Sequence, residues 1–405
     1  MFSPLKNLVK RSRGLYLKLG PLFALYRNSV MRAARAFGGT DDNMVVFSSF
    51  DYRSYSDNPR YISEALHEMR PETDIVWLFK DGENARARFD IPDYIRIYNS
   101  IENRGVAAMA RARVVVDNFN KRFYLAFPGR KQIYIQTWHG DRAFKKVGFD
   151  NAGQYTKMIE EHCSLGVTGS DYGDRQFRSA FHYKGELLKV GYPRNDILIR
   201  NDPAEAARIR ARIGAGADEG LLLYAPTFRD TEQRAHAKQK VPLDLYRVLD
   251  RLEELDGRRW RCLVRAHYLS WGIPLDDGTG RLLPVSDYPE MAELLLISDA
   301  LLTDYSSCAG DFALTRRPIF LYQDDLEDYQ RNDRALYFDM KDSPYWVAST
   351  QEGLDEIIAA CTPERARENC DAILKFYGEA ETGHAAQSVA EYIVKQLRPA
   401  KGGAR

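Results

Sequence analysis

The sequence predicts an α/β protein made of two doubly wound, Rossmann-like domains that face a central cleft. With 405 residues, the chain exceeds one ordinary core and fits two domains of about 150–200 residues each. Short apolar runs of strand length alternate with helical patterns along most of the chain, which is typical of parallel sheets covered by helices on both faces. A polar stretch rich in glycine and alanine, residues 201–220, divides this alternation into two series.

Residues 1–40 form a segment of unusual charge, because they hold eight Lys or Arg and no Asp or Glu. The whole chain has a net charge of +1, so the other residues together carry −7. Apolar residues recur at helical spacing from Leu5 to Val30, with interruptions at Gly14 and Gly20-Pro21. We predict a basic amphipathic helical segment that lies on an anionic membrane surface. An ordinary helix packed on the protein body is the alternative.

Residues 41–200 are predicted to form the first domain. Its strand-like runs span residues 44–50, 75–79, 94–98, 114–117, 133–138, 165–169 and 187–190. Helical patterns lie between them, at residues 61–69, 101–111, 155–162 and 174–181. Because strands and helices alternate, the pattern indicates a parallel sheet with helices on both faces.

Residues 201–375 are predicted to form the second domain, and residues 376–405 a C-terminal helix and tail. The strand-like runs span residues 221–226, 262–266, 282–285, 300–304 and 319–322. The clearest helical patterns cover residues 244–255, 289–297, 309–315, 354–360, 364–376 and 386–397. Ligands of such sheets bind beyond the carboxyl ends of the strands, so two facing domains would share one cleft. This layout is GT-B-like.

Composition and missing motifs exclude several classes of protein. The five cysteines are scattered without a Cys-x-x-Cys pair, which indicates neither a zinc site nor a disulfide framework and favours a reducing cytoplasm. No apolar run is long enough to span a membrane. The chain has no P-loop and no Gly-x-Gly-x-x-Gly after its first strand, which argues against a P-loop nucleotidase and a dinucleotide oxidoreductase. We predict no metal site.

Polar clusters recur where predicted strands end. The central one follows the run 300–304, where Ser306 and Ser307 form a turn before a helix, suited to phosphate or simply to capping a structural helix. The clusters are His139-Gly140-Asp141, Gly191-Tyr192-Pro193-Arg194-Asn195-Asp196, Pro226-Thr227-Phe228-Arg229, Arg265-Ala266-His267, Ser286-Asp287 and Ser306-Ser307. Each alone could be a structural turn. Six at the same end of two sheets predict one cleft.

The residue types in this predicted cleft suit a diphosphate. Its cations and neutral donors are Lys145, Lys146, Arg194, Arg229, Arg265, Thr227, Ser306 and Ser307. His139 and His267 could move protons near neutral pH, although a single histidine is more often structural than catalytic.

The ordered motifs resemble a known family, the CDP-glycerol glycerophosphotransferases, which are the teichoic-acid and capsule polyol-phosphate transferases of bacteria. The matching motifs are Trp138-His139-Gly140, Gly191-Tyr192-Pro193-Arg194-Asn195-Asp196, Ala225-Pro226-Thr227-Phe228-Arg229, Arg265-Ala266-His267, Thr303-Asp304-Tyr305-Ser306-Ser307, Pro318-Ile319-Phe320-Leu321-Tyr322 and Tyr337-Phe338-Asp339. They occur in the family's order and span about half of the chain, residues 133–339.

The resemblance implies a GT-B fold bound peripherally to the cytoplasmic face of the cell membrane. It also implies that residues 41–200 form the acceptor side of the cleft and that residues 201–375 bind the donor. The implied reaction transfers glycerol phosphate or ribitol phosphate from a CDP-alditol to a hydroxyl of a lipid-linked saccharide or a teichoic-acid-like polymer, and releases CMP. The resemblance implies neither a further cofactor nor a nucleic acid partner, and it leaves homo-oligomerisation open. His139 would be the general base, and His267 would sit at the donor diphosphate. The resemblance assigns substrate binding to Trp138, Gly140, Asp141, Lys145, Arg194, Pro226, Thr227, Arg229, Arg265, Ser286, Ser306, Ser307 and Asp311.

The sequence departs from the family pattern in three places, one of which is Asn332-Asp333-Arg334-Ala335 in place of the usual Arg-Gly before Tyr337-Phe338. Asp141-Arg142 stand where the family usually has Thr-Pro, and an acidic Asp141 beside a diphosphate would be unfavourable unless a nearby cation compensates. Cys308-Ala309-Gly310 precede Asp311, where the family tends to carry bulky residues. Two other hypotheses remain: a GT-B glycosyltransferase or epimerase that uses a nucleotide sugar, and an inactive membrane-docked polymer-binding protein. Retention of both histidines favours an enzyme.

Overall fold

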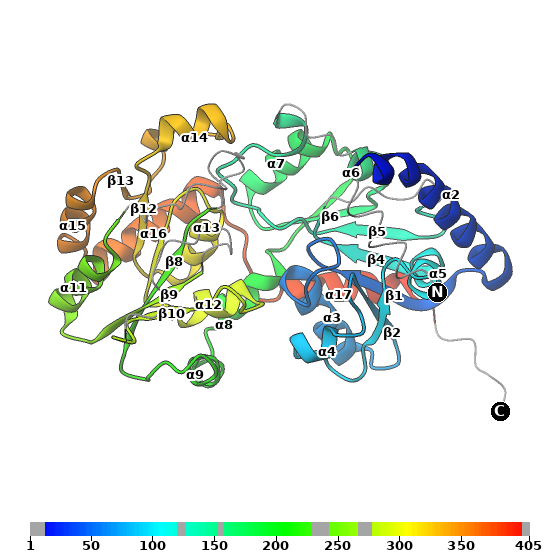
Figure 1. The fold of residues 1–405 in the computed structure, drawn as a ribbon, viewed down its shortest axis with the longest axis horizontal. Helices are drawn as coiled ribbons and strands as arrows, with labels where there is room; N and C mark the ends of the chain where they lie inside the picture. The colour runs from blue at the N-terminus through cyan, green and yellow to red at the C-terminus, as the bar shows by residue number, and fades with distance from the viewer. Residues whose placement is uncertain (1–12, 120–126, 152–156, 228–242, 266–277, 399–405) are drawn as a thin grey trace.

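Two parallel β-sheets lie side by side in the computed structural model, which describes residues 13–119, 127–151, 157–227, 243–265 and 278–398 (Figure 1). Helices cover both faces of each sheet, and both predicted sheets are present. Among the described residues, no helix combines the length and the apolar character that crossing a bilayer requires.

The first sheet has seven strands in the order β3-β2-β1-β4-β5-β6-β7, and all of its neighbours pair in parallel. The strands are β1 (Asp41–Ser48), β2 (Asp74–Phe79), β3 (Arg96–Asn99), β4 (Ala112–Asp117), β5 (Ile133–Gln136), β6 (Leu165–Thr168) and β7 (Glu186–Lys189). Side chains alternate across β1: Val45 and Phe47 enter one buried cluster and Val46 the opposite one. Burial on both faces explains why these strands are continuous apolar runs.

The second sheet has six strands in the order β10-β9-β8-β11-β12-β13, again all parallel. The strands are β8 (Gly220–Ala225), β9 (Trp260–Val264), β10 (Leu282–Pro284), β11 (Ala300–Thr303), β12 (Ile319–Tyr322) and β13 (Val347–Ala348). The sequence pattern did not indicate β13, because two residues show no periodicity.

The helices follow the predicted alternation with a few additions. Those within residues 41–200 are α3 (Asp57–Met69), α4 (Ala85–Arg88), α5 (Asn103–Arg111), α6 (Lys157–His162), α7 (Asp171–Phe181) and α8 (Asp196–Arg200). Those that follow are α9 (Pro203–Arg212), α11 (Leu245–Asp256), α12 (Met291–Ile297), α13 (Cys308–Phe312), α14 (Leu326–Asn332), α15 (Gln351–Ala359), α16 (Pro363–Tyr377) and α17 (Ala385–Gln396). Single 3₁₀ turns occur at Gly148–Asp150, Pro193–Asn195, Ala313–Thr315 and Met340–Asp342.

Helix α9 lies inside residues 201–220, which the sequence indicated only as a polar boundary. Asp202 caps this helix by accepting a hydrogen bond from the Ala204 N–H, and Pro203 takes the first helical position. Only Ile209 of α9 is buried. The helix therefore lacks the apolar stripe that makes an amphipathic pattern visible.

Helix α2 (Arg13–Gly38) covers part of the predicted N-terminal segment and runs through Gly20-Pro21 without the predicted interruption. Its Met31 side chain is fully buried against the first domain, beside Val46 of β1 and Met109 of α5. The last turns of α2 are therefore part of the first-domain core.

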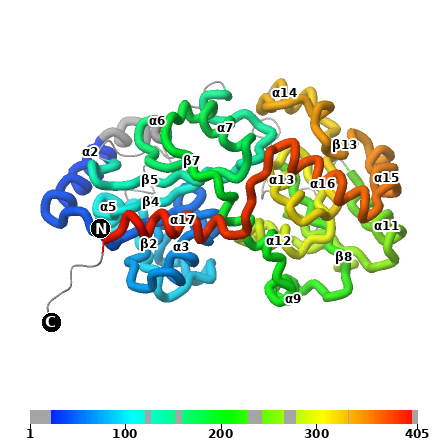
Figure 2. The backbone as a smooth tube through the Cα atoms, turned by 180° about the vertical axis from the view of Figure 1, so that it is seen from behind, coloured from blue at the N-terminus to red at the C-terminus, as the bar shows by residue number. Residues whose placement is uncertain are grey.

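The chain crosses between the domains a second time near its C-terminus (Figure 2). Helix α16 packs on the second domain through Ile373, whereas Val389 and Ile393 of α17 pack against the first sheet with Ile62 of α3. The predicted C-terminal helix thus completes the first domain. The crossing itself places Glu381 between the domains, where its side chain is fully buried.

Candidate functional site

A cavity of about 270 Å³ opens between the two domains at the carboxyl ends of their strands. It brings together seven predicted site residues: His139 and Arg194 of the first domain, and Pro226, Arg265, Ser306, Ser307 and Asp311 of the second. Sequence reasoning did not single out other lining residues, which include Phe50, Asp57, Met291, Ala292 and Leu295. The predicted cleft between strand ends is thus a physical cavity in the structure.

Other predicted site residues lie around this cavity rather than along its wall. Trp138 packs against the His139 ring, and Gly140 faces the second domain, where an added Cβ would lie 3.5 Å from Ser307 Oγ. Thr227 donates its main-chain N–H to the Asp304 carboxylate, 2.9 Å away. Ser286 is exposed after β10. Arg229 and His267 lie outside the described residues.

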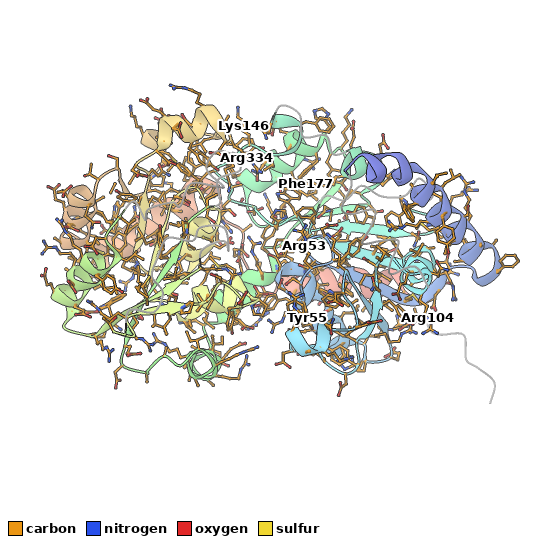
Figure 3. The ribbon with its side chains drawn as sticks, in the orientation of Figure 1. Arg53, Tyr55, Arg104, Lys146, Phe177 and Arg334 are labelled. Atoms are coloured by element: carbon orange, nitrogen blue, oxygen red, sulfur yellow. The ribbon has the colours of Figure 1, made fainter. Side chains whose placement is uncertain are left out.

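Lys145 lies where the two domains meet. Its backbone forms an isolated antiparallel bridge with Leu336, and the Lys146 N–H donates to the Ala335 carbonyl at 2.9 Å. Figure 3 shows Lys146 and Arg334 close together at this junction. The loop that follows His139 is therefore attached to the second domain by its main chain.

The backbone conformation and one main-chain contact fix His139. Strand β5 ends at Gln136, and Trp138 then adopts a left-handed φ of +53°, which turns the chain into the cleft. His139 Nδ1 lies 2.6 Å from the main-chain oxygen of Asn118. Because a carbonyl oxygen only accepts, Nδ1 carries the proton of the neutral ring, and Nε2 holds the lone pair. Such a ring can accept a proton at Nε2.

The surroundings of His139 favour its neutral form. Burial lowers the pKa of His139, and the positive charges of Arg194 and Lys145 act in the same direction. The hydrogen bond to Asn118 and the Asp57 carboxylate oppose this shift without cancelling it. Phe119 stacks on the ring at 5.8 Å, and Phe50 meets its edge at 5.5 Å. The ring is thus held in an apolar frame as an unprotonated base.

Asn118 is a site residue that sequence reasoning missed. Its side-chain oxygen accepts the Phe50 N–H at 2.8 Å, and its amide nitrogen donates to Ser49 Oγ at 3.2 Å. These bonds tie the ends of β1 and β4 together and hold the carbonyl that orients His139. Asp117-Asn118 is also a polar pair at a strand end, so the pattern that found the other clusters could have found it.

Among its described residues, the second domain supplies the hydroxyls of Ser306 and Ser307 and the cation of Arg265 to the cavity. Ser307 precedes α13, but its hydroxyl makes no capping hydrogen bond, and Ser306 Oγ accepts a long hydrogen bond of 3.4 Å from the Cys308 N–H. Arg265 donates to the main-chain oxygen of Tyr288 at 2.6 Å, and burial lowers its pKa. In the part of the chain that the structure describes, no carboxylate forms an ion pair with Arg265. The Glu290 carboxylate opposes this lowering of the pKa, and a phosphate would add a further negative charge beside Arg265.

Arg194 was predicted to bind phosphate, but its guanidinium binds protein groups instead. Its guanidinium donates to the carboxylates of Asp57 and Asp311, each at 2.7 Å, and to the main-chain oxygen of His139 at 3.0 Å. All three charged side chains are almost fully buried. Although Arg194 and Asp311 line the cavity, their charges are already paired with one another.

Asp141 points away from the cleft. Its carboxylate accepts hydrogen bonds from the Gly169 N–H at 2.8 Å and from Ser170 Oγ at 2.6 Å, inside the first domain. Burial raises the pKa of Asp141, and the neighbouring Arg142 opposes that shift. The conflict expected between an acidic residue and a diphosphate is avoided, because the carboxylate is directed into the protein.

Several curated proteins of similar sequence are named for the chemistry that the sequence predicts. The chain is 31% identical to a teichoic acid poly(glycerol phosphate) polymerase of Bacillus spizizenii, over 87% of this chain and 92% of the relative. It is also 31% identical to a teichoic acid glycerol-phosphate transferase of Staphylococcus aureus, over 87% of this chain and 93% of the relative. Other relatives are longer, and the chain spans 54% of the polymerase of Staphylococcus epidermidis.

Solved structures and a family model lead to the same family. The wall teichoic acid polymerase TagF matches with a TM-score of 0.79 at 26% identity, over 94% of this chain and 95% of that one, which confirms the GT-B-like fold. A UDP-N-acetylglucosamine 2-epimerase of Listeria monocytogenes shares the fold alone, with a TM-score of 0.51 at 13% identity, 87% coverage of this chain and 96% of that one. The family model described as CDP-Glycerol:Poly(glycerophosphate) glycerophosphotransferase matches residues 29–395. The chain therefore belongs to the family of CDP-glycerol:poly(glycerophosphate) glycerophosphotransferases.

Proposed function

We propose that this protein transfers glycerol phosphate or ribitol phosphate from a CDP-alditol to a hydroxyl of a lipid-linked saccharide or a polyol-phosphate polymer. The observation that carries the proposal is one cavity in which a neutral histidine of the first domain faces Arg265, Ser306 and Ser307 of the second. Family membership supports it, and relatives are named as glycerol-phosphate and ribitol-phosphate enzymes of teichoic acid synthesis.

In the proposed reaction, Nε2 of His139 takes the proton of the acceptor hydroxyl. The acceptor oxygen attacks the phosphorus that carries the alditol, and the bond from this phosphorus to the bridging oxygen breaks, so that CMP leaves. Arg265 and the two serine hydroxyls stabilise the negative charge of the diphosphate as this bond breaks. His267 would act there as well. The CDP-alditol is a substrate, and the proposal includes no further cofactor.

The proposal is tested by measuring CMP release from CDP-glycerol and from CDP-ribitol with a lipid-linked disaccharide as acceptor. Acceptor-dependent CMP from one donor would establish the reaction and identify the alditol. If neither CDP-alditol binds while a UDP-sugar does, the chain is a nucleotide-sugar enzyme instead. Binding of the polymer without turnover of any donor would favour the inactive polymer-binding protein.

The lowered pKa of His139 predicts how the rate depends on pH. A general base acts in its neutral form, so the rate falls on the acid side only as the pH approaches its pKa. Because the pKa of His139 lies below the ordinary histidine value of about 6.5, we expect the acid limb of kcat/KM below that pH. The measurement is the pH profile of CMP release at low donor concentration. A limb centred at or above the ordinary value would contradict the environment described for His139.

We further propose that α2 attaches the protein to the cytoplasmic face of the membrane. Three of its side chains, Leu22, Leu25 and Phe37, are exposed by 62%, 65% and 93%. Phe23 and Tyr26, next to the two leucines in the sequence, are also exposed, and several exposed large apolar side chains in one region mark an interaction surface. The exposed Arg32 accompanies them. Exposed apolar and basic side chains on one helix suit an anionic bilayer surface.

The membrane proposal predicts that Leu22→Ser with Leu25→Ser weakens binding to phosphatidylglycerol vesicles by about tenfold or more, because each leucine would lose its apolar burial. Substitution is preferable to deleting α2, since Met31 belongs to the core. Binding of the parent protein should fall as salt is raised. The matched control is Leu255→Ser on α11, where the leucine is 43% exposed. Equal vesicle binding by both variants and the parent would refute the proposal.

A further inference from the structure

One carboxylate, that of Asp311 in the second domain, is held by two arginines of the first domain. Its Oδ1 accepts from Arg142 Nη1 at 3.1 Å, and its Oδ2 accepts from Arg194 Nη2 at 2.7 Å. Asn195 adds a third hydrogen bond to Oδ1, also at 3.1 Å. The side chains of Asp311 and Arg142 are 3% and 0% exposed. We call Arg142, Arg194 and Asp311 the interdomain clamp.

The clamp joins the two catalytic segments of the proposed site. Arg142 follows His139 by three residues, and Arg194 donates to the His139 main-chain oxygen. On the other side, Asp311 belongs to α13, the helix that begins directly after Ser306 and Ser307. The clamp therefore connects the segment that carries His139 to the turn that carries Ser306 and Ser307.

The packing around Arg142 accommodates a side chain that reaches from the first domain to the second. A Cβ added to Gly310 would lie 2.6 Å from the Arg142 Cβ, so only glycine leaves room for the arginine. Arg142 also pairs with Glu381 at 2.9 Å, and Phe144 inserts its ring between Phe338 and Tyr345 of the second domain. Two of the family departures, Asp141-Arg142 and Cys308-Ala309-Gly310, thus meet in space.

We infer that Arg142 and Asp311 are positioning residues, which set the distance and orientation of His139 relative to the diphosphate held by Ser306 and Ser307. Neither needs to touch the donor, because the charge of each is compensated by the other and by its remaining partners. Positioning of this kind affects the chemical step, which is sensitive to small displacements of the reacting groups. The inference rests on the proposed function.

The kinetic test compares Asp311→Asn and Arg142→Lys with the parent protein. Asparagine keeps the shape of Asp311 but loses its charge, and lysine cannot reproduce the forked contacts of Arg142. We expect kcat for CMP release to fall at least tenfold, while the donor Kd changes less than threefold. An unchanged kcat at a temperature where the variants are folded would overturn the inference. A donor Kd raised as much as kcat is lowered would show that Asp311 binds the donor directly.

The matched control is Asp299→Asn, which removes a similar arginine contact within the second domain. Asp299 pairs with Arg210 at 2.9 Å and does not line the cavity. This variant is expected to lose thermal stability and keep kcat. An equal loss of kcat in the control would show that kcat reports general destabilisation, and would overturn the positioning role.

A second readout does not depend on which donor the enzyme uses. Amide hydrogen exchange is measured in the intact protein, parent and Asp311→Asn. We expect residues 139–144 and 306–312 to exchange faster together in the variant, and neither segment to change in Asp299→Asn. If only residues 306–312 respond, the clamp does not couple the two segments. Failure of the proposed reaction would leave this exchange result intact, so the two failures are distinguishable.

Discussion

Replacing His139 by alanine is expected to lower CMP release by about 10²- to 10⁴-fold, the usual contribution of a positioned general base. The loss follows from geometry, because His139 Nε2 holds a lone pair in the cleft while Nδ1 is committed to the Asn118 carbonyl. Donor affinity should stay within a few-fold of the parent value, since Arg265, Ser306 and Ser307 remain in place. The measurement is single-turnover CMP release at saturating donor, with donor binding measured separately by calorimetry.

His162→Ala is the matched control for this experiment. His162 ends α6, its side chain is 34% exposed, and its ring contacts Glu161 rather than the cleft. The His162→Ala variant should release CMP at the parent rate. Near-parent turnover by His139→Ala would show that another group takes the acceptor proton. A donor Kd raised in parallel with the loss of rate would instead assign His139 to donor binding.

The periodic elements of this fold could be predicted because burial on both faces of a parallel sheet leaves a strong signal in the sequence. Strand β1, with Val45 and Val46 buried on opposite faces, is an example. Elements without such burial were missed. Helix α9 buries only Ile209, and β13 has two residues, so neither produces a period that can be recognised.

The site could be predicted as far as topology alone determines it. Parallel strands end at the same edge, so polar residues that follow β5, β9 and β11 were expected to meet, and His139, Arg265 and Ser306 do line one cavity. Topology does not determine the direction in which a side chain points. Asp141 and Arg194 also follow strands, yet their charged groups bind Ser170 and Asp311.

Long-range ion pairs explain this difference. Arg194 and Asp311 are 117 residues apart, and Arg142 and Asp311 are 169 residues apart. No local pattern marks such partners, because a cation that binds phosphate and a cation that binds a protein carboxylate look the same in the sequence. What separates them is burial. Replacing an arginine whose charge is already paired inside the protein lowers the stability of the fold, whereas replacing an arginine that binds phosphate weakens substrate binding.

We therefore predict a large loss of stability for Arg194→Ala. The substitution would leave the carboxylate of Asp57 without its ion-pair partner and that of Asp311 with only Arg142 and Asn195. Removing one partner of a buried pair costs about 3–5 kcal/mol, because the remaining charge stays desolvated. We therefore expect the melting temperature to fall by roughly 10 °C.

The measurement is thermal unfolding followed by circular dichroism, with Arg208→Ala as the control. Arg208 is 55% exposed and meets Glu205 only at 3.5 Å, so its removal should change stability by less than about 1 kcal/mol. A phosphate ligand would behave in the opposite way: Arg194→Ala would keep the parent melting temperature and bind the CDP-alditol more weakly. Such an outcome would mean that the donor displaces the carboxylates of Asp57 and Asp311 from Arg194, and that the paired state of this arginine is only the resting form of the cleft.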